Sequence, residues 1–113
     1  MIAFVDDSYY FQAWVSKNYP KARFFFSEIE LIEYIKKNSG VLSLVFMDQL
    51  IDGYDALDDT LPTLYPDIKF VLLTANKLLP SEKQELSNAG YLGYISKLDH
   101  HPESKINKWI RKQ

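Results

Sequence analysis

The sequence predicts an α/β domain built on an open, parallel β-sheet with helices on both faces. Short apolar runs typical of buried parallel strands alternate along the chain with segments whose apolar residues recur at helical spacing. Five strands alternating with five helices imply parallel strands joined by right-handed crossovers. In addition, polar residues directly follow four of the five apolar runs, and open α/β sheets hold their ligands at such strand ends.

The predicted strands are short and mainly apolar. The first runs from Ile2 to Val5, and the other four cover residues 23–26, 41–47, 68–73 and 91–96. No basic segment precedes the first run, so the N-terminus is interpreted as a strand and not as a signal peptide.

Two of the predicted helices begin with a capping box, in which a hydroxyl accepts from an amide three residues on and an acidic or amide side chain reaches back. Ser27 and Glu30 form the first box, ahead of a helix that ends at residues 38–40. Residues Pro80 to Gln84 form the second box, and that helix is predicted to stop at residues 89–90.

The remaining three helices are predicted from apolar residues at helical spacing, each set marking one buried stripe. These residues are Phe11, Trp14 and Val15 in the first helix, Leu57, Leu61 and Leu64 in the third, and Ile106, Trp109 and Ile110 in the fifth. Pro20 closes the first helix. Pro62 lies inside the third, which covers Tyr54 to Tyr65, so a kink or break is expected there.

Composition narrows the class of protein. A chain of 113 residues is expected to form one domain, and 47% apolar with 25% charged residues is ordinary for a soluble globular protein. A net charge of -2 with dispersed basic residues does not favour direct binding to nucleic acid or an anionic membrane. The chain has no cysteine and no apolar stretch near the ~20 residues that span a bilayer. A cytoplasmic protein is expected.

Five polar residues follow the predicted strands. Asp6 and Asp7 follow the first, Asp48 the third, Thr74 the fourth, and Lys97 the fifth. If these strands are parallel neighbours, three carboxylates, a hydroxyl and an ammonium meet at one edge of the sheet. Because like charges a few ångströms apart repel, such a cluster is costly without a function, and a divalent cation would resolve the repulsion.

These motifs resemble those of the response-regulator receiver domains of two-component signalling. The matching segments are Phe-Val-Asp6-Asp7-Ser, Val-Phe-Met-Asp48, Val-Leu-Leu-Thr74-Ala and Tyr-Ile-Ser-Lys97, in order along the whole chain. The resemblance implies a CheY-like fold, which is a doubly wound five-stranded parallel sheet in the flavodoxin-like order 2-1-3-4-5. It also implies that residues 1–113 are a single receiver domain with no output domain.

The resemblance assigns roles to the cluster. Asp48 is the expected phosphoacceptor, and Lys97 pairs with a phosphoryl oxygen. Mg²⁺ is the expected cofactor, bound directly by Asp7, Asp48 and the backbone carbonyl of Leu50, and through water by Asp6. Because a carboxylate is a weak nucleophile toward an anionic phosphoryl group, catalysis here is charge neutralisation and alignment.

The resemblance also implies a switch. Thr74 donates its hydroxyl to the arriving phosphoryl group, Ala75 leaves the path to Asp48 open, and Tyr94 turns inward. The surface of the fourth helix, fifth strand and fifth helix then changes and binds a downstream effector or a second copy of the chain. The expected phosphodonor is a histidine kinase or a phosphotransfer protein. Such a domain is an acceptor that can lose its own phosphate, and is not a turnover enzyme.

Two departures from the family pattern concern the loops beside the cluster. The family usually has a cis proline after the lysine, whereas here Leu98 follows; a cis bond before a non-proline residue costs ~2.5–4 kcal/mol, so a trans bond is predicted. The loop up to Pro102 is then expected to be reorganised, which brings the position of Lys97 into question. The segment after Asp48 is also short, with Asp52-Gly53 arriving early, which brings the orientation of the Leu50 carbonyl into question. Leu50 and Asn76 also occupy positions that, in the receiver family, influence how long the phosphoryl group survives on the aspartate.

Other interpretations remain open. The main alternative is a degenerate receiver that acts as a phosphorylation-independent protein-interaction module. A haloacid-dehalogenase-like phosphatase is a third interpretation. That family has an Asp-x-Asp motif followed by glycine, whereas this chain has Asp6-Asp7-Ser8. Taken singly, Asp7 with Ser8 could simply cap the first helix, Tyr94 could be an ordinary edge-strand aromatic, and residues 100–101 are expected to be solvent-facing histidines.

Overall fold

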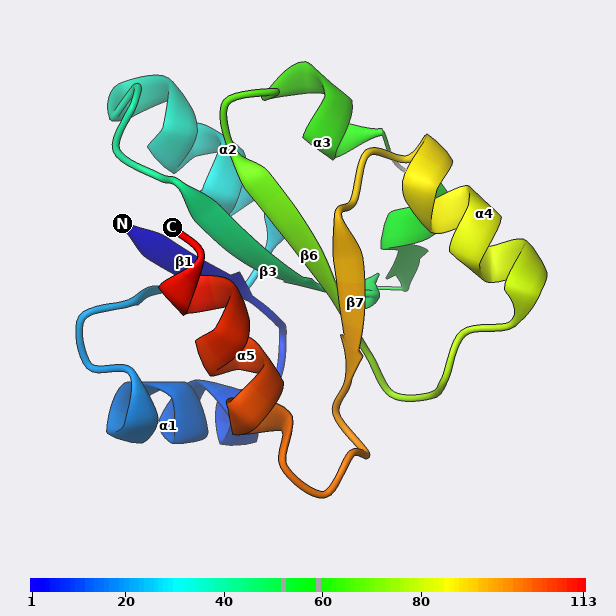
Figure 1. Cartoon of the computed structure of the whole chain (residues 1–113). Coiled ribbons are helices and arrows are strands. Elements are labelled where there is room, and N and C mark those ends of the chain that lie inside the picture. The colour runs from blue at the N-terminus through cyan, green and yellow to red at the C-terminus, as the bar shows by residue number, and fades with distance from the viewer. Residues whose placement is uncertain (52, 59) are drawn as a thin grey trace.

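The computed structural model describes residues 1–51, 53–58 and 60–113. Five parallel strands form one sheet in the order β2-β1-β3-β6-β7 (Figure 1). These strands are β1 (Ile2–Val5), β2 (Arg23–Phe25), β3 (Leu44–Asp48), β6 (Lys69–Thr74) and β7 (Gly93–Ser96). This is the predicted order 2-1-3-4-5, so the fold-class prediction is confirmed. Three predicted strands were too long. The second was predicted to end one residue too late, the third to begin three residues too early, and the fifth to begin two residues too early.

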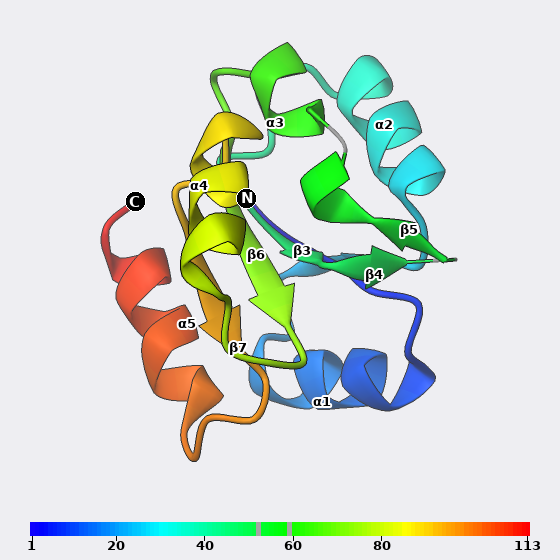
Figure 2. The ribbon, with the colours of Figure 1, turned by 90° about the vertical axis from the view of Figure 1, so that its right-hand side faces the viewer.

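Helices cover both faces of the sheet (Figures 1 and 2). They are α1 (Tyr9–Asn18) and α5 (Pro102–Arg111) on one face, and α2 (Glu28–Lys37), α3 (Leu61–Leu64) and α4 (Pro80–Asn88) on the other. Alternate residues of each central strand therefore enter two separate cores. Phe4, Phe46 and Val71 pack toward α1 and α5, whereas Val5, Met47 and Leu72 pack toward α2, α3 and α4. None of the helices in the described part of the chain has the length and apolar character needed to span a bilayer.

The two predicted capping boxes have different outcomes. At α2, the Glu30 N–H donates to Ser27 Oγ at 3.2 Å, and Glu30 Oε2 accepts from the Phe26 N–H at 2.7 Å. The prediction is confirmed there, with the carboxylate reaching one residue further back than expected. At α4, the box predicted from Pro80 to Gln84 is wrong. The N-cap is Leu79, which has no side-chain acceptor, and only the bond from the Leu79 N–H to Glu82 Oε1 (2.9 Å) remains.

The predicted helix from Tyr54 to Tyr65 is wrong. In its place lie an antiparallel hairpin of β4 (Leu50–Ile51) and β5 (Tyr54–Asp55), the 3-10 turn η1 (Ala56–Asp58) and the single turn α3. In Figure 2, η1 lies between α4 and α2, and it contacts α4. Asp-Gly is a favoured two-residue hairpin turn, and Gly53 has a φ of +82°, which a side chain would disfavour. Asp52 lies outside the described residues.

Two of the three leucines predicted to be buried in this segment are buried although the helix is broken, and the prediction is wrong for Leu64. Leu57 in η1 and Leu61 in α3 are both buried, while Leu64 is 67% exposed. Pro62 stands in the first turn of α3, where its missing N–H costs no intrahelical bond. The break expected at this proline is therefore where the helix begins.

Gly93 in β7 makes room for the indole of Trp109 on α5. A Cβ built on Gly93 would lie 2.8 Å from Trp109 Cζ2, which is closer than carbon atoms tolerate. We expect Gly93→Ala to lower the free energy of unfolding by about 1–3 kcal/mol through this overpacking, measured by urea denaturation. In a Trp109→Leu background, where the indole is gone, Gly93→Ala should lower the free energy of unfolding by less than it does in wild type. A single variant as stable as wild type would contradict this account of the contact.

Candidate functional site

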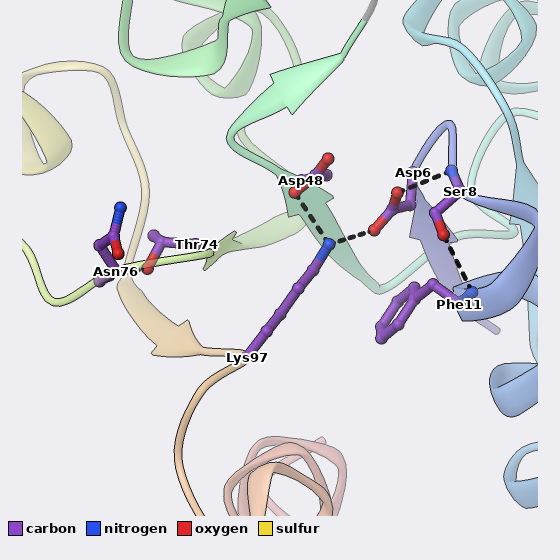
Figure 3. A network of polar contacts seen from close by, with 7 residues as sticks. All are labelled: Asp6, Ser8, Phe11, Asp48, Thr74, Asn76 and Lys97. Atoms are coloured by element: carbon purple, nitrogen blue, oxygen red, sulfur yellow. Dashed lines mark hydrogen bonds and ion pairs between the residues drawn. The ribbon is translucent and has the colours of Figure 1, made fainter.

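The parallel register brings the predicted polar residues to one edge of the sheet. Val5 of β1 pairs with Met47 of β3, so the residues that follow them, Asp6 and Asp48, lie side by side. Thr74 ends β6, and Lys97 follows the end of β7, two strands from Asp48. Figure 3 shows the Lys97 side chain extending toward the two carboxylates.

Lys97 joins the two buried carboxylates. Its Nζ donates to Asp48 Oδ1 at 3.0 Å and to Asp6 Oδ2, as the dashed lines of Figure 3 mark. Asp6 is 1% exposed and Asp48 9% exposed, so both charges are largely removed from water. The Lys97–Leu98 bond is trans, as predicted, and the lysine still reaches the site.

Burial and neighbouring charges shift the pKa values of Asp48 and Lys97. Burial raises the pKa of the Asp48 carboxyl to about 6; the charges of Asp6 and Asp7 act in the same direction, while Lys97 opposes them. For Lys97, burial acts to lower the pKa, but the hydrogen bond to Asp6 and the charge of Asp48 outweigh it and raise the pKa above its ordinary value. The ammonium is thus retained as the cation of the cluster.

The donor set suits a hard divalent cation. Asp6, Asp7 and Asp48 each place a carboxylate oxygen so that the three atoms lie within 4.8 Å of one another. Two oxygens on one Mg²⁺ lie at most ~4.2 Å apart, and this ion usually keeps several waters. The oxygens therefore fit the inner and outer shells of one Mg²⁺ after small rotations. This is the one group of three potential metal-ligating side chains among the described residues, and the histidines at 100–101 contribute none.

Asp6 also organises the start of α1. Its Oδ1 accepts from the Ser8 N–H at 2.9 Å, and Ser8 Oγ in turn accepts from the Phe11 N–H at 3.2 Å. The N-cap of α1 is therefore Ser8, so of the pair Asp7–Ser8 that could cap this helix, the serine is the capping residue. Asp7 is exposed at the edge of the acidic cluster.

Phe11 is a residue of this site that sequence reasoning placed only in the core. Lys97 Nζ lies 4.7 Å from the centroid of its ring (Figure 3). At this distance the ring face attracts the ammonium. Its place one turn after the acidic pair was the available signal, but helical spacing alone reads the same residue as part of a buried stripe.

The predicted switch residues lie further along the same edge. Thr74 is fully buried, and its hydroxyl donates to the Asn76 carbonyl (Figure 3). Ala75 is exposed, and Tyr94 is half-buried against the core on the α4 side of the sheet. The aromatic ring is therefore neither fully exposed nor fully inserted.

Leu50 belongs to the hairpin and is 60% exposed. It pairs with Asp55, and beside this pair the Ala56 N–H donates to the Gln49 carbonyl at 2.6 Å. Leu50 and Asp55 are thus a non-hydrogen-bonded pair, so the Leu50 carbonyl does not bond across the hairpin. The carbonyl remains available to another partner.

A cavity of about 610 Å³ opens beside Asp48, between α2 and the hairpin. Met47, Ile51 and Leu61 form apolar parts of its lining, and its polar lining includes Glu28 and Asp55. Asp48 is therefore approachable from the side of the shortened α3 as well as from the edge of the sheet.

No protein-family model and no curated protein matches the chain, but solved structures share its fold. The response regulator LqsR from Legionella pneumophila has a TM-score of 0.79 at 23% identity, over 98% of this chain and 42% of LqsR. A CheY-like receiver domain protein from Methanospirillum hungatei has a TM-score of 0.77 at 19% identity, over 98% of this chain and 90% of that one. The BeF3-activated receiver domain of DrrB from Thermotoga maritima has a TM-score of 0.74 at 19% identity, over 97% of this chain and 93% of the DrrB domain.

The chain therefore has the fold of response-regulator receiver domains, as the motifs suggested. It spans less than half of LqsR, and identities this low describe the fold and not the activity. What the site does must be argued from its own residues.

Proposed function

We propose that this domain is the phosphoacceptor receiver of a two-component phosphorelay. The observation that carries the proposal is the position of Asp48, buried at the end of β3, bonded to Lys97 and clustered with two further carboxylates. A histidine kinase or a histidine phosphotransfer protein is the proposed donor. In this proposal the domain is a signalling acceptor and not a turnover enzyme, a role supported by its likeness to receiver domains.

In this mechanism, an Asp48 carboxylate oxygen attacks the phosphorus atom in line with the departing imidazole. The oxygen–phosphorus bond forms as the phosphorus–nitrogen bond of phosphohistidine breaks, and the imidazole leaves with the electron pair. Lys97, already directed at Asp48, turns to a phosphoryl oxygen and balances its charge. Asp7, Asp48 and the Leu50 carbonyl would hold a Mg²⁺ ion directly, and Asp6 would hold it through water; the ion would supply further charge neutralisation.

The same residues support a proposed switch. A phosphoryl group on Asp48 brings new acceptor oxygens to the edge, and Thr74 exchanges its bond to the Asn76 carbonyl for one to the phosphoryl group. Ala75 leaves the approach open, and Tyr94 moves further into the core on the α4 side. The surface of α4, β7 and α5 then presents a changed face to an effector protein or to a second copy of the chain, in the cytoplasm.

Covalent labelling of Asp48 tests this function. With acetyl phosphate and millimolar Mg²⁺, intact mass spectrometry should show one added phosphoryl group, which does not form when Mg²⁺ is chelated beforehand or in Asp48→Asn. Beryllofluoride should bind under the same conditions. Asp67→Asn changes an exposed carboxylate outside the acidic cluster and should label as wild type.

The degenerate-receiver alternative predicts the opposite outcome. If the folded wild type takes no label and binds no beryllofluoride at millimolar Mg²⁺, the phosphoacceptor proposal is wrong and the domain acts through protein contacts alone. Turnover of a phosphomonoester would instead revive the phosphatase reading.

A further inference from the structure

The position of the Lys97 ammonium is not explained by the chain that follows it. Leu98 is 74% exposed, so the next residue does not anchor the lysine by packing. On one side of the lysine stem lies an apolar cavity of about 210 Å³, lined among others by Trp14, Leu73 and Ile106. A flexible four-carbon stem beside open space has room to swing away from Asp48, so its direction depends on the groups that contact the ammonium, which are Asp6, Asp48 and the ring of Phe11.

The ring of Phe11 is one of these restraints. Lys97 Nζ lies 4.7 Å from its centroid, close enough for the electron-rich face to attract the ammonium. The ring is itself held, because it stacks on Trp14 at 5.5 Å and contacts Phe4 edge-on at 6.1 Å. A ring fixed by two aromatic neighbours constrains the cation more than a mobile one does.

Asp6 ties this ring and the lysine into a closed circuit of contacts (Figure 3). One oxygen of Asp6 accepts a hydrogen bond from the Ser8 N–H, and Ser8 Oγ accepts one from the Phe11 N–H at the first turn of α1. The other oxygen of Asp6 accepts from Lys97. The same carboxylate therefore sets both the start of the helix that carries the ring and the direction of the ammonium.

We propose that Phe11 is a positioning residue for phosphoryl transfer, whose ring face keeps the Lys97 ammonium directed at Asp48. The inference rests on the proposed function of Asp48, and Phe11 itself touches no reacting atom. Its effect on phosphorylation passes through Lys97 alone.

The proposal is tested by substitutions at position 11 that remove the aromatic ring but keep an apolar side chain, or that keep the ring. Phe11→Leu keeps an apolar side chain and loses the ring face, so phosphorylation of Asp48 by acetyl phosphate should slow by about 3- to 30-fold. Phe11→Tyr keeps the face and should retain the wild-type rate. Phe25→Leu removes a ring from the core on the opposite face of the sheet, where it contacts Tyr34, and should leave the rate unchanged.

A double-substitution cycle shows whether the effect passes through Lys97. In a Lys97→Met background, Phe11→Leu should slow phosphorylation no further. An equal slowing in both backgrounds, or no slowing in wild type with the fold intact, overturns the positioning role.

Nuclear magnetic resonance gives a readout that does not depend on the chemistry. The Lys97 Hε resonances should show an upfield ring-current shift that Phe11→Leu removes and Phe25→Leu leaves in place. If the shift is absent in wild type, the positioning inference fails even where Asp48 is phosphorylated. If the shift is present but wild type takes no label, the proposed function fails, and with it the catalytic meaning of the contact.

Discussion

Replacing Lys97 with methionine should lower the rate of Asp48 phosphorylation by about two to three orders of magnitude. The expected loss is that of one preorganised donor aimed at developing negative charge. The single-turnover rate with acetyl phosphate at saturating Mg²⁺ measures it. Lys105→Met is the matched control, because Lys105 pairs with Asp99 outside the cluster and its loss should leave the rate unchanged.

The same variant should also be less stable when metal is chelated. Asp6 and Asp48 would then be buried without their cation, which costs about 3 kcal/mol for a pair broken from one side. Adding Mg²⁺ should stabilise Lys97→Met more than it stabilises wild type. In the variant no ammonium competes with the ion for the carboxylates of Asp6 and Asp48. A variant that labels at the wild-type rate would show that Lys97 is only a structural partner of the carboxylates.

Asp48→Asn should make the metal-free protein more stable at neutral pH, by about 1–3 kcal/mol. The pKa of Asp48 is raised from 3.8 to about 6 in the folded protein, so between these values the folded state binds more protons than the unfolded state. Wild-type stability should therefore fall as pH rises from about 4 to about 6, and the loss should persist above that window. The asparagine carries no charge and escapes this penalty, while Lys97 keeps Asp6 as its partner.

Urea denaturation across this pH range in the presence of a chelator measures the effect. Asp48→Asn should show a flatter profile between pH 4 and 6, and Mg²⁺ should stabilise it less than it stabilises wild type. Asp67→Asn should follow the wild-type curve. An asparagine variant less stable than wild type at pH 7 would mean that the ion pair with Lys97 outweighs the burial of the carboxylate.

The sequence predicted the sheet and most helices because the apolar periodicity of those segments agrees with their local punctuation. Ser27 and Glu30 cap α2 as expected, and the stripe of α5 is uninterrupted. The segment from Tyr54 to Tyr65 misled because Leu57 and Leu61 satisfy helical spacing while belonging to two separate turns. Spacing records which side chains are buried, but not whether one continuous helix buries them.

The candidate site divides in the same way. Asp6, Asp48 and Lys97 were predictable because strand ends of a parallel sheet share one edge, and the structure brings the three together. The contribution of Phe11 was not predictable. Its ring meets an ammonium that comes from the other end of the chain, and an apolar residue on a helical stripe carries no mark of that encounter.

The long separation between Asp6 and Lys97 has a consequence for how the protein is made. The two residues stand 91 positions apart, and Lys97 follows an edge strand, which is the last strand to leave the ribosome. Until β7 docks, Asp6 and Asp48 repel each other without an ammonium between them, so docking this strand both completes the sheet and neutralises its acidic edge. Transient release of β7 would remove the lysine from the site, so the two buried carboxylates have their cation only while this edge strand is docked.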